Sequence, residues 1–524
     1  MEMDKGGVKR KEIDWPVFYI SGGFFLAFII ASFINIDAVS KFVYTAFHWS
    51  VNWFGAFWQV ICLLTVIISL GLAISKYGSV RLGRQGAPDI TTLRWLSMIM
   101  MTLLAGGGIF WSAAEPLFHY LEPAPIYPDI QGSTEEAIIP SLATTFVHWS
   151  YNVWAILGSL LAVVYMYAFH EKGLPLKPRT LLYPVFGEKG VYSLGGTFAD
   201  AFSSIAAVAS VVGPIGFLAL QMGYFLEQLF GIHNVFSTHL SILLLLVAIY
   251  TVSAITGLYR GIQFLSRVNV YLAVFLMGLI LLVGPGRFIV NNFFDAFILY
   301  NKNYFQATLY RGDPEWLGMW TIFFFGWFMA GAPIMGTFIA RISRGRTIRE
   351  IVLACTVIAP LCTKFWFTVL GGSGIYYEFN NPGTISQPLS ESGLPAVLLN
   401  IGYQLPLSYI FIPGFMIILI LFLSTSGDSY SYSIAMITTG KMTPNVGVRA
   451  FWGVMMGGLA AVLISIGEGG IDALQYFIII TNVPVAFLLV PSFWAAPMFA
   501  KKMYGEQFGG KITNISREGK SKYL

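Results

Sequence analysis

The chain has 524 residues, of which 56% are hydrophobic and only 11% are charged, and its formal net charge is +5. Soluble domains carry about 25% charged residues, so this composition excludes a protein whose whole surface faces water. The positive charges lie in short segments between long apolar blocks, a pattern that indicates membrane topology rather than nucleic-acid binding. Three scattered cysteines predict neither a metal site nor a disulfide framework.

Twelve apolar blocks are long enough to cross a bilayer as α-helices, since one span needs about 20 residues. In chain order they are 16–36, 56–75, 93–114, 141–168, 198–230, 238–258, 267–285, 316–342, 349–372, 407–438, 449–466 and 472–499. The segment 287–312 mixes aromatic residues with Asn, Asp and Lys, which is typical of a helix that lies at the membrane interface.

Lysine and arginine gather in alternate loops. They precede the first block and follow the second, fourth, eighth, tenth and twelfth, whereas 115–140 and 373–406 contain none. Because cytoplasmic loops carry the excess of basic residues, the pattern predicts twelve spans in the cell membrane with both termini in the cytoplasm. We expect membrane lipid around the chain and no nucleic-acid partner.

The third block contains the run Ala105, Gly106, Gly107 and Gly108, followed by Trp111. Each glycine weakens a helix by about 1 kcal/mol relative to alanine. Such a run suits an unwound stretch whose carbonyls face a cavity, or the close packing of two helices. Both interpretations stay open at this stage.

The eighth block contains Gly331 and Pro333 shortly after Trp327 and Phe328. Proline removes a helical hydrogen bond, so we expect a broken helix here, with a simple kink as the alternative. Interruptions five spans apart, in the third and eighth helices, are typical of transporters built from inverted repeats. The halves would be helices three to seven and eight to twelve.

Two further blocks carry unusual side chains. The fourth places Trp149 and Trp154 close together, which fits either an interfacial aromatic belt or one wall of a cage for a quaternary ammonium. The tenth has six polar residues in a short run that includes Thr425 and Ser426. These hydroxyls are suited to ligate Na⁺, or they bond back to their own helix.

Charged residues are rare inside the blocks. Lys364 lies within the ninth block, where a charged lysine costs about 2.5–3.5 kcal/mol. It either reaches toward the outer face or points inward as a fixed cation or proton carrier that replaces a coupling ion. We expect structural roles for Asp428 and for Glu115, which precedes Pro116 and should lie at a helix end.

The run FIARISRGRTIRE at 338–350 closely resembles the signature that follows the eighth helix of betaine/choline/carnitine transporters. The resemblance extends in family order from about residue 15 to 500. It also rests on Phe110-Trp111…Glu115-Pro116-Leu117, Ala143-Thr144-Thr145…His148-Trp149…Trp154-Ala155, Gly261-Ile262-Gln263…Leu265-Ser266 and Thr425-Ser426…Asp428-Ser429. It implies an all-α fold with a leucine-transporter-like core of two inverted five-helix repeats, assembled as a homotrimer.

The implied regions follow the repeats. Residues 1–92 hold the N-terminus and two peripheral helices, 93–286 the first repeat, 287–315 the interfacial helix region, 316–500 the second repeat and 501–524 the cytoplasmic tail.

The resemblance also implies a substrate site. Trp149 and Trp154 match the family, and Trp327 is kept, but Phe328 and Gly331 stand where betaine-binding relatives usually have tryptophan. This implies a cage with fewer aromatic faces, each worth about 0.5–2 kcal/mol to a methylated cation. The predicted substrate set is completed by Ala105, Gly106, Gly107, Gly108 and Trp111.

Ion coupling follows from the same comparison. Thr425 and Ser426 match sodium-ligating positions, with Phe422 one turn before, whereas Ala207 and Val211 replace threonines of sodium-dependent relatives. This implies at most one sodium site, and no other cofactor.

The resulting expectation is a secondary transporter of a small zwitterionic or quaternary ammonium solute, such as glycine betaine, choline or carnitine. A sodium-independent precursor/product antiporter and a carrier of an unmethylated amino-acid-like substrate stay open. A channel needs a pore lined by repeated polar or charged rings, and the sequence shows none. An enzyme needs a catalytic constellation, and the sequence shows none of these either.

Overall fold

The computed structural model describes residues 13–84, 86–104, 107–256, 259–439, 444–466 and 470–518. These residues form helices and no strand; one isolated bridge joins Arg81 and Thr347. The main helices are α1 (Trp15–Ile34), α2 (Ile36–Ile74), α3 (Thr92–Leu104), α4 (Gly108–Leu121), α5 (Ile138–His148), α6 (Tyr151–Lys172), α8 (Leu194–Phe230), α9 (Phe236–Thr256), α10 (Tyr259–Val283), α11 (Gly286–Lys302), α13 (Pro314–Met319), α14 (Thr321–Ile342), α15 (Ile348–Leu353), α16 (Ala359–Asn380), α19 (Ser408–Thr439), α20 (Val446–Ser465), α21 (Ile471–Leu489) and α22 (Ser492–Glu518). The short helices are α7 (Tyr183–Val191), α12 (Tyr304–Thr308), α17 (Ser386–Ser392) and α18 (Val397–Gln404).

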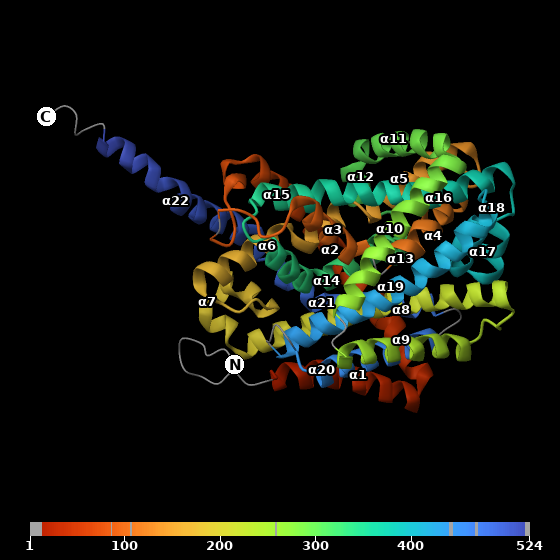
Figure 1. Ribbon diagram of the computed structural model, residues 1–524, viewed down its shortest axis with the longest axis horizontal. Coiled ribbons are helices and arrows are strands. Elements are labelled where there is room, and N and C mark those ends of the chain that lie inside the picture. The colour runs from red at the N-terminus through yellow and green to blue at the C-terminus, as the bar shows by residue number, and fades with distance from the viewer. Residues whose placement is uncertain are drawn as a thin grey trace.

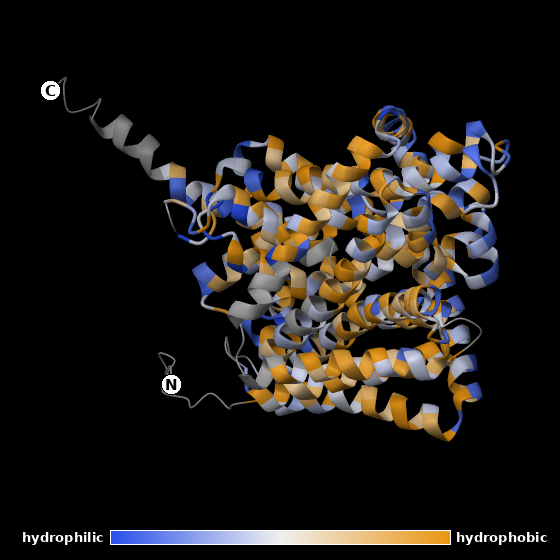
Figure 2. Ribbon diagram, turned by 45° about the vertical axis from the view of Figure 1, so that its right-hand side comes forward, coloured by the Kyte–Doolittle hydropathy of each residue, from blue (hydrophilic) through white to orange (hydrophobic). Residues whose placement is uncertain are grey.

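Within the described ranges, eight helices are long and apolar enough to cross a membrane, and nine if the bent pair 267–283 and 286–302 counts as one span. Large apolar side chains are exposed on several of them, for example Phe33, Ile74 and Leu282. Figure 2 shows this apolar colouring along the outer helices. Lipid accepts such surfaces, whereas water does not, so the chain is a multi-pass membrane protein.

A central group of helices holds the core. Helix α14 packs against α6, α21 and α8, and α2 packs against α6 and α21. Helices α1, α9 and α20 lie along one edge of the molecule, with α20 packed on both α9 and α1, and α11 lies at the opposite edge (Figure 1). Helix α22 extends from the body toward the C-terminus (Figure 1).

The predicted interruption of the third block coincides with helix ends. Helix α3 ends at Leu104, and α4 begins at Gly108 with Gly107 as its N-terminal cap. The fourth block is also divided, because α5 ends at His148 and α6 begins at Tyr151. Glu115, expected at a helix end, lies instead inside α4.

The expected break at Gly331 and Pro333 is wrong. Helix α14 continues through Pro333, and the chain breaks earlier, at Trp320 between α13 and α14. Neighbouring helices can accommodate a proline within a membrane helix. The carbonyl that Pro333 leaves without its helical donor is that of Met329. The hydroxyl of Tyr165 on α6 donates to the carbonyl of Pro333 itself over 3.0 Å, which joins α6 to α14 at this turn.

The segment predicted at the interface contains α11 and α12. Helix α11 turns by 106° from the end of α10 and packs against α5 and α16. Phe294 and Ile298 on α11 are exposed, whereas Phe293 and Tyr300 are buried. One side of the helix therefore belongs to the core, and its location at a membrane interface stays a prediction.

The signature run lies in a turn that joins two distant loops. The amide of Leu82 donates to the carbonyl of Arg346, Gly345 donates to Leu82, and Ile348 donates to Val80, over 2.8–3.0 Å. Gly345 has a φ of +80°, and a Cβ atom there would lie 2.2 Å from the carbonyl oxygen of Ala87.

Arg346 completes this junction. Its guanidinium lies over the ring of Trp95 at 4.7 Å and donates to the carbonyl of Ile90 at 2.7 Å and to Thr92 Oγ1 at 3.0 Å. The turn thus joins the loop before α3 to the loop after α14. The run at 338–350 therefore has a structural role.

Gly345 provides a stability test. Gly345→Ala should lower the melting temperature of the detergent-purified protein, because a left-handed conformation costs a non-glycine residue about 1–2 kcal/mol and the methyl group would meet Ala87. Gly173→Ala is the control, since Gly173 has a φ of +69° with nothing within 4 Å of the added Cβ. Equal losses in both variants would contradict the role of the Ala87 contact.

Candidate functional site

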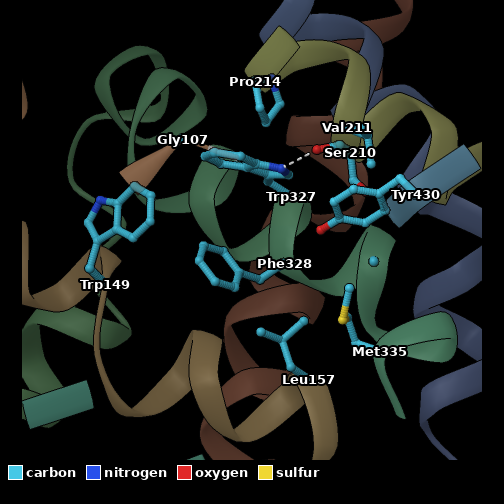
Figure 3. A pocket seen from close by; sticks show the side chains of 11 residues that line it. Gly107, Trp149, Leu157, Ser210, Val211, Pro214, Trp327, Phe328, Met335 and Tyr430 are labelled. Carbon is cyan, nitrogen blue, oxygen red and sulfur yellow. Dashed lines mark hydrogen bonds between the residues drawn. The ribbon is translucent and has the colours of Figure 1, made fainter. Parts of the chain in front are cut away.

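A partly open pocket lies between the central helices; the space in it that is not filled by atoms, open solvent included, is about 510 Å³. Helix α14 contributes four lining residues, α8 three, and α6, α19 and the segments before α4 and α6 one each (Figure 3). The lining residues are Gly107, Trp149, Leu157, Ser210, Val211, Pro214, Trp327, Phe328, Gly331, Met335 and Tyr430.

Three aromatic rings form one corner of this pocket. The ring of Trp149 is perpendicular to those of Trp327 and Phe328, with centroids 5.8 Å and 5.5 Å away. Trp327 and Phe328 are 5.7 Å apart. Figure 3 shows them between Trp149 on one side and Tyr430 and Met335 on the other. The faces of aromatic rings attract a cation that has lost its hydration shell.

The orientation of Trp327 follows from a proline on another helix. Pro214 in α8 has no amide hydrogen, so the carbonyl of Ser210, four residues earlier, loses its helical donor. The indole N–H of Trp327 donates to that carbonyl over 2.7 Å (Figure 3). A buried carbonyl without a partner costs about 1–3 kcal/mol, so this bond both satisfies α8 and fixes the Trp327 ring.

Two of the lining glycines differ in the space around them. A Cβ atom on Gly107 would lie 2.4 Å from Cη2 of Trp327, whereas one on Gly331 would meet only Ser210 Oγ at 3.6 Å. Gly107 is therefore required for the close approach of the Trp327 ring. Gly331 leaves open space on the pocket side of α14.

The structure places part of the predicted substrate set in the pocket. Gly107, Trp149, Trp327, Phe328 and Gly331 line it, whereas Gly108, Trp111 and Trp154 do not. Trp111 is buried instead among the rings of Phe217, Trp320, Phe323 and Phe324. Ala105 and Gly106 lie outside the described residues.

Six lining residues were not predicted for the substrate: Leu157, Ser210, Val211, Pro214, Met335 and Tyr430. Most are ordinary apolar residues with no chemical signal in the sequence. Pro214 within a long apolar block and Tyr430 in the polar run of the tenth block were the available hints.

The predicted sodium positions are only partly visible. Phe422 is buried in α19, and Ala207 and Val211 are buried in α8. Thr425 and Ser426 belong to α19, but their side chains lie outside the described part of the structure.

Trp149 is held from behind by an acid. Its indole N–H donates to Glu115 Oε2 over 2.6 Å, and Glu115 Oε1 lies 2.5 Å from His148 Nδ1. All three side chains are at most 1% exposed. The ring that forms one wall of the pocket is thus directly bonded to a buried carboxyl group.

Lys364 is fully buried and lies among aromatic rings rather than in the pocket. Its Nζ is 3.9 Å from the ring centroid of Tyr151, 4.5 Å from that of Tyr300 and 4.7 Å from that of Phe297. Nζ has no hydrogen-bond partner within the described ranges. Lys364 therefore links α16 to α11 and to Tyr151, the first residue of α6. Tyr151 lies two residues after Trp149 in the sequence.

Comparison with known proteins decides the family. The model of the "BCCT, betaine/carnitine/choline family transporter" matches residues 16–505. The chain belongs to this family of transporters. This membership confirms the resemblance and the expectation that the chain is not an enzyme.

Curated relatives cover nearly the whole chain. "Glycine betaine transporter 2" of Vibrio parahaemolyticus is 46% identical over 500 residues, which are 95% of this chain and 92% of the relative. "Glycine betaine transporter OpuD" of Bacillus subtilis is 32% identical over 90% of this chain and 92% of its own length. An "Ectoine/hydroxyectoine transporter" of Virgibacillus pantothenticus is 29% identical over 92% and 96%.

The two lining glycines provide a matched test of the pocket. Gly107→Ala should weaken solute binding at least tenfold, because its methyl group displaces Trp327. Gly331→Ala should change binding less than threefold, because its methyl group enters open space. Binding to the purified variants is measured by tryptophan fluorescence, and equal effects would contradict the proposed role of Trp327 packing.

Proposed function

We propose that this protein is a secondary transporter of a small zwitterionic or quaternary ammonium solute, of the glycine betaine class, working by alternating access. The observation that carries the proposal is the corner of Trp149, Trp327 and Phe328, which offers three ring faces to an ammonium group. The names of the relatives, two for glycine betaine and one for ectoines, support the same class of solute.

Each part of the solute has a place in this proposal. The ammonium end lies against the three rings, and Trp154 supports the cage from its buried position outside the lining. The backbone around Ala105–Gly108 and Trp111 orients the carboxylate. Compared with a cage of tryptophans alone, Phe328 and Gly331 leave a wider pocket, which favours a solute larger than the smallest betaines or one with fewer methyl groups.

The larger architecture belongs to the proposal as well. Twelve spans and a cytoplasmic-membrane location with both termini inside rest on the twelve apolar blocks and the alternating basic loops. Two inverted five-helix repeats and a homotrimer rest on the likeness to the family. The interruption between α3 and α4, where Gly107 lines the pocket, supports a transporter site built at a broken helix.

Ion coupling is proposed at one site. Thr425 and Ser426, with Phe422 one turn before, would bind a single Na⁺, because hydroxyl and carbonyl oxygens suit a hard cation. The alternative is sodium-independent precursor/product exchange. Ala207 and Val211 favour it, because their side chains have no oxygen atom that could bind Na⁺.

The decisive experiment is solute binding to the purified protein, followed by tryptophan fluorescence, with glycine betaine, choline, carnitine and methionine in the presence and absence of Na⁺. We expect saturable binding of a methylated ammonium compound, with Trp149→Ala weakening it about tenfold through loss of one ring face. Binding of methionine alone would contradict the ammonium assignment and leave the transporter assignment intact.

The sodium dependence is read in the same experiment. If Na⁺ raises the affinity and Ser426→Ala removes that effect, the single-site proposal holds. Counterflow of labelled solute in proteoliposomes without any ion gradient, unaffected by Ser426→Ala, would support exchange instead.

Lys364 is proposed as the fixed cation that replaces a second coupling ion. Lys364→Met should preserve folding, since an apolar side chain can replace a buried charge without loss of stability, while changing the ion dependence of transport. Lys302→Met on the exposed end of α11 is the control. Unchanged transport and ion dependence in Lys364→Met would overturn this role.

A further inference from the structure

A second group of ionisable side chains lies directly behind the pocket. Glu115 and His119 on α4 and His148 at the end of α5 are all fully buried. One side-chain nitrogen or oxygen atom from each of the three lies within 4.8 Å of those from the other two. His119 Nε2 is 3.7 Å from Glu115 Oε1, and neither ring nitrogen of His119 makes a hydrogen bond of standard geometry within the described ranges.

The charge of Glu115 is not balanced by lysine or arginine. Among the described residues, its ion-pair partners are His119 and His148 alone. An isolated carboxylate in a low-dielectric interior is very unfavourable. The sealed cluster therefore favours the form that contains one added proton, either on the carboxyl group or on an imidazole, which makes the group neutral overall.

Other charged groups on the surrounding helices face elsewhere. Glu122 at the end of α4 and Glu315 on α13 are exposed. On α16, Lys364 lies among the rings of Tyr151, Phe297 and Tyr300, and Glu378 accepts hydrogen bonds from the amides of residues 383, 385 and 386. Arg341 on α14 is exposed at the far end of that helix. The charge state of the cluster thus depends on its own three members.

The cluster contacts the pocket through one residue. Trp149 donates its indole N–H to Glu115 Oε2, and the same ring lines the pocket. When Glu115 carries a negative charge, it increases the electron density of the indole and strengthens attraction between the ring face and a cation. A cation bound at Trp149 in turn favours the negatively charged cluster over the neutral one.

We propose that Glu115, His119 and His148 form a proton-binding site that is linked to the solute pocket through Trp149. The cluster holds one exchangeable proton when the pocket is empty and releases it to water when an ammonium group binds against Trp149. This inference rests on the proposed function, because the released proton is balanced by the positive end of the solute.

The same three side chains are of the types that bind metals. However, both ring nitrogens of His148 are already engaged, Nδ1 by Glu115 and Nε2 by Thr321 Oγ1 at 3.0 Å. A metal ion held by Glu115 Oε1 and His148 Nδ1 would have to replace the hydrogen bond between these two atoms. The hydrogen-bonded geometry favours a proton.

The test is the release of protons on addition of glycine betaine to the purified protein in a weakly buffered solution with a pH indicator. We expect up to one proton released per molecule bound, and an affinity that rises by up to about tenfold per pH unit over the range where the cluster exchanges its proton. Glu115→Gln, which cannot become negative, should release none and should bind weakly and independently of pH.

Glu378→Gln is the matched control, since it removes another buried acid on a neighbouring helix that does not contact the pocket. It should release protons as the wild type does. Binding without proton release, proton uptake instead of release, or equal release by Glu115→Gln would each overturn the proposed link. A stoichiometric metal that is lost in Glu115→Gln would overturn it as well.

A ligand-free measurement separates this inference from the proposed function. In a pH-induced infrared difference spectrum, subtracting the spectrum of Glu115→Gln or of His148→Gln from that of the wild type should leave carboxyl and imidazole bands from the cluster, and these cluster bands should also be present in Glu378→Gln. If none of the tested solutes binds, the proposed function fails, and these bands still decide whether the proton site exists. Their presence in Glu115→Gln would contradict it.

Discussion

The hydrogen bond from the Trp327 indole to the Ser210 carbonyl is the interaction on which the pocket depends. Pro214 frees that carbonyl, and a membrane interior supplies no water to replace the missing donor. The bond therefore fixes α14 against α8 and holds the Trp327 ring flat against Gly107. The rings of Trp149 and Phe328 pack against Trp327. The missing backbone donor in α8 therefore determines the shape of a site that four helices line.

Much of the fold could be predicted because apolar block length and basic residues have direct physical meaning in a membrane. Each of the twelve predicted blocks contains a helix, although only eight to nine helices pass a test of length and composition within the described ranges. The error at Pro333 has a specific cause: a proline predicts one lost helical hydrogen bond, but it does not show whether the packing of neighbouring helices keeps the helix continuous. The actual break, at Trp320, follows Gly318 by two residues, and a single glycine near the start of an apolar block is too common a feature to predict a break.

The candidate site was predicted less completely, for a similar reason. Trp149, Trp327 and Phe328 were recognised because aromatic rings have a chemical signature, but Trp154 was grouped with Trp149 on their closeness in the sequence and on the family resemblance. The chain breaks between them, since α5 ends at His148 and α6 begins at Tyr151, so no helical period relates their directions. Ser210, Leu157 and Met335 resemble any other core residue and could be found only from the packed structure.

The two buried charges near the pocket are stabilised in different ways, and the difference has a consequence for solute binding. Lys364 is surrounded by the faces of aromatic rings, which attract a cation, and it does not line the pocket. Glu115 is bonded to an imidazole that can gain or lose a proton and to the indole that forms the pocket wall. Uncharged rings alone bind a cation by about 0.5–2 kcal/mol each, and this chain has fewer of them than a cage of tryptophans would. In the proposed linkage, the negative charge that appears behind Trp149 on binding adds attraction for the ammonium group. It does so without placing a carboxylate inside the pocket, where it would repel the acidic end of a zwitterion.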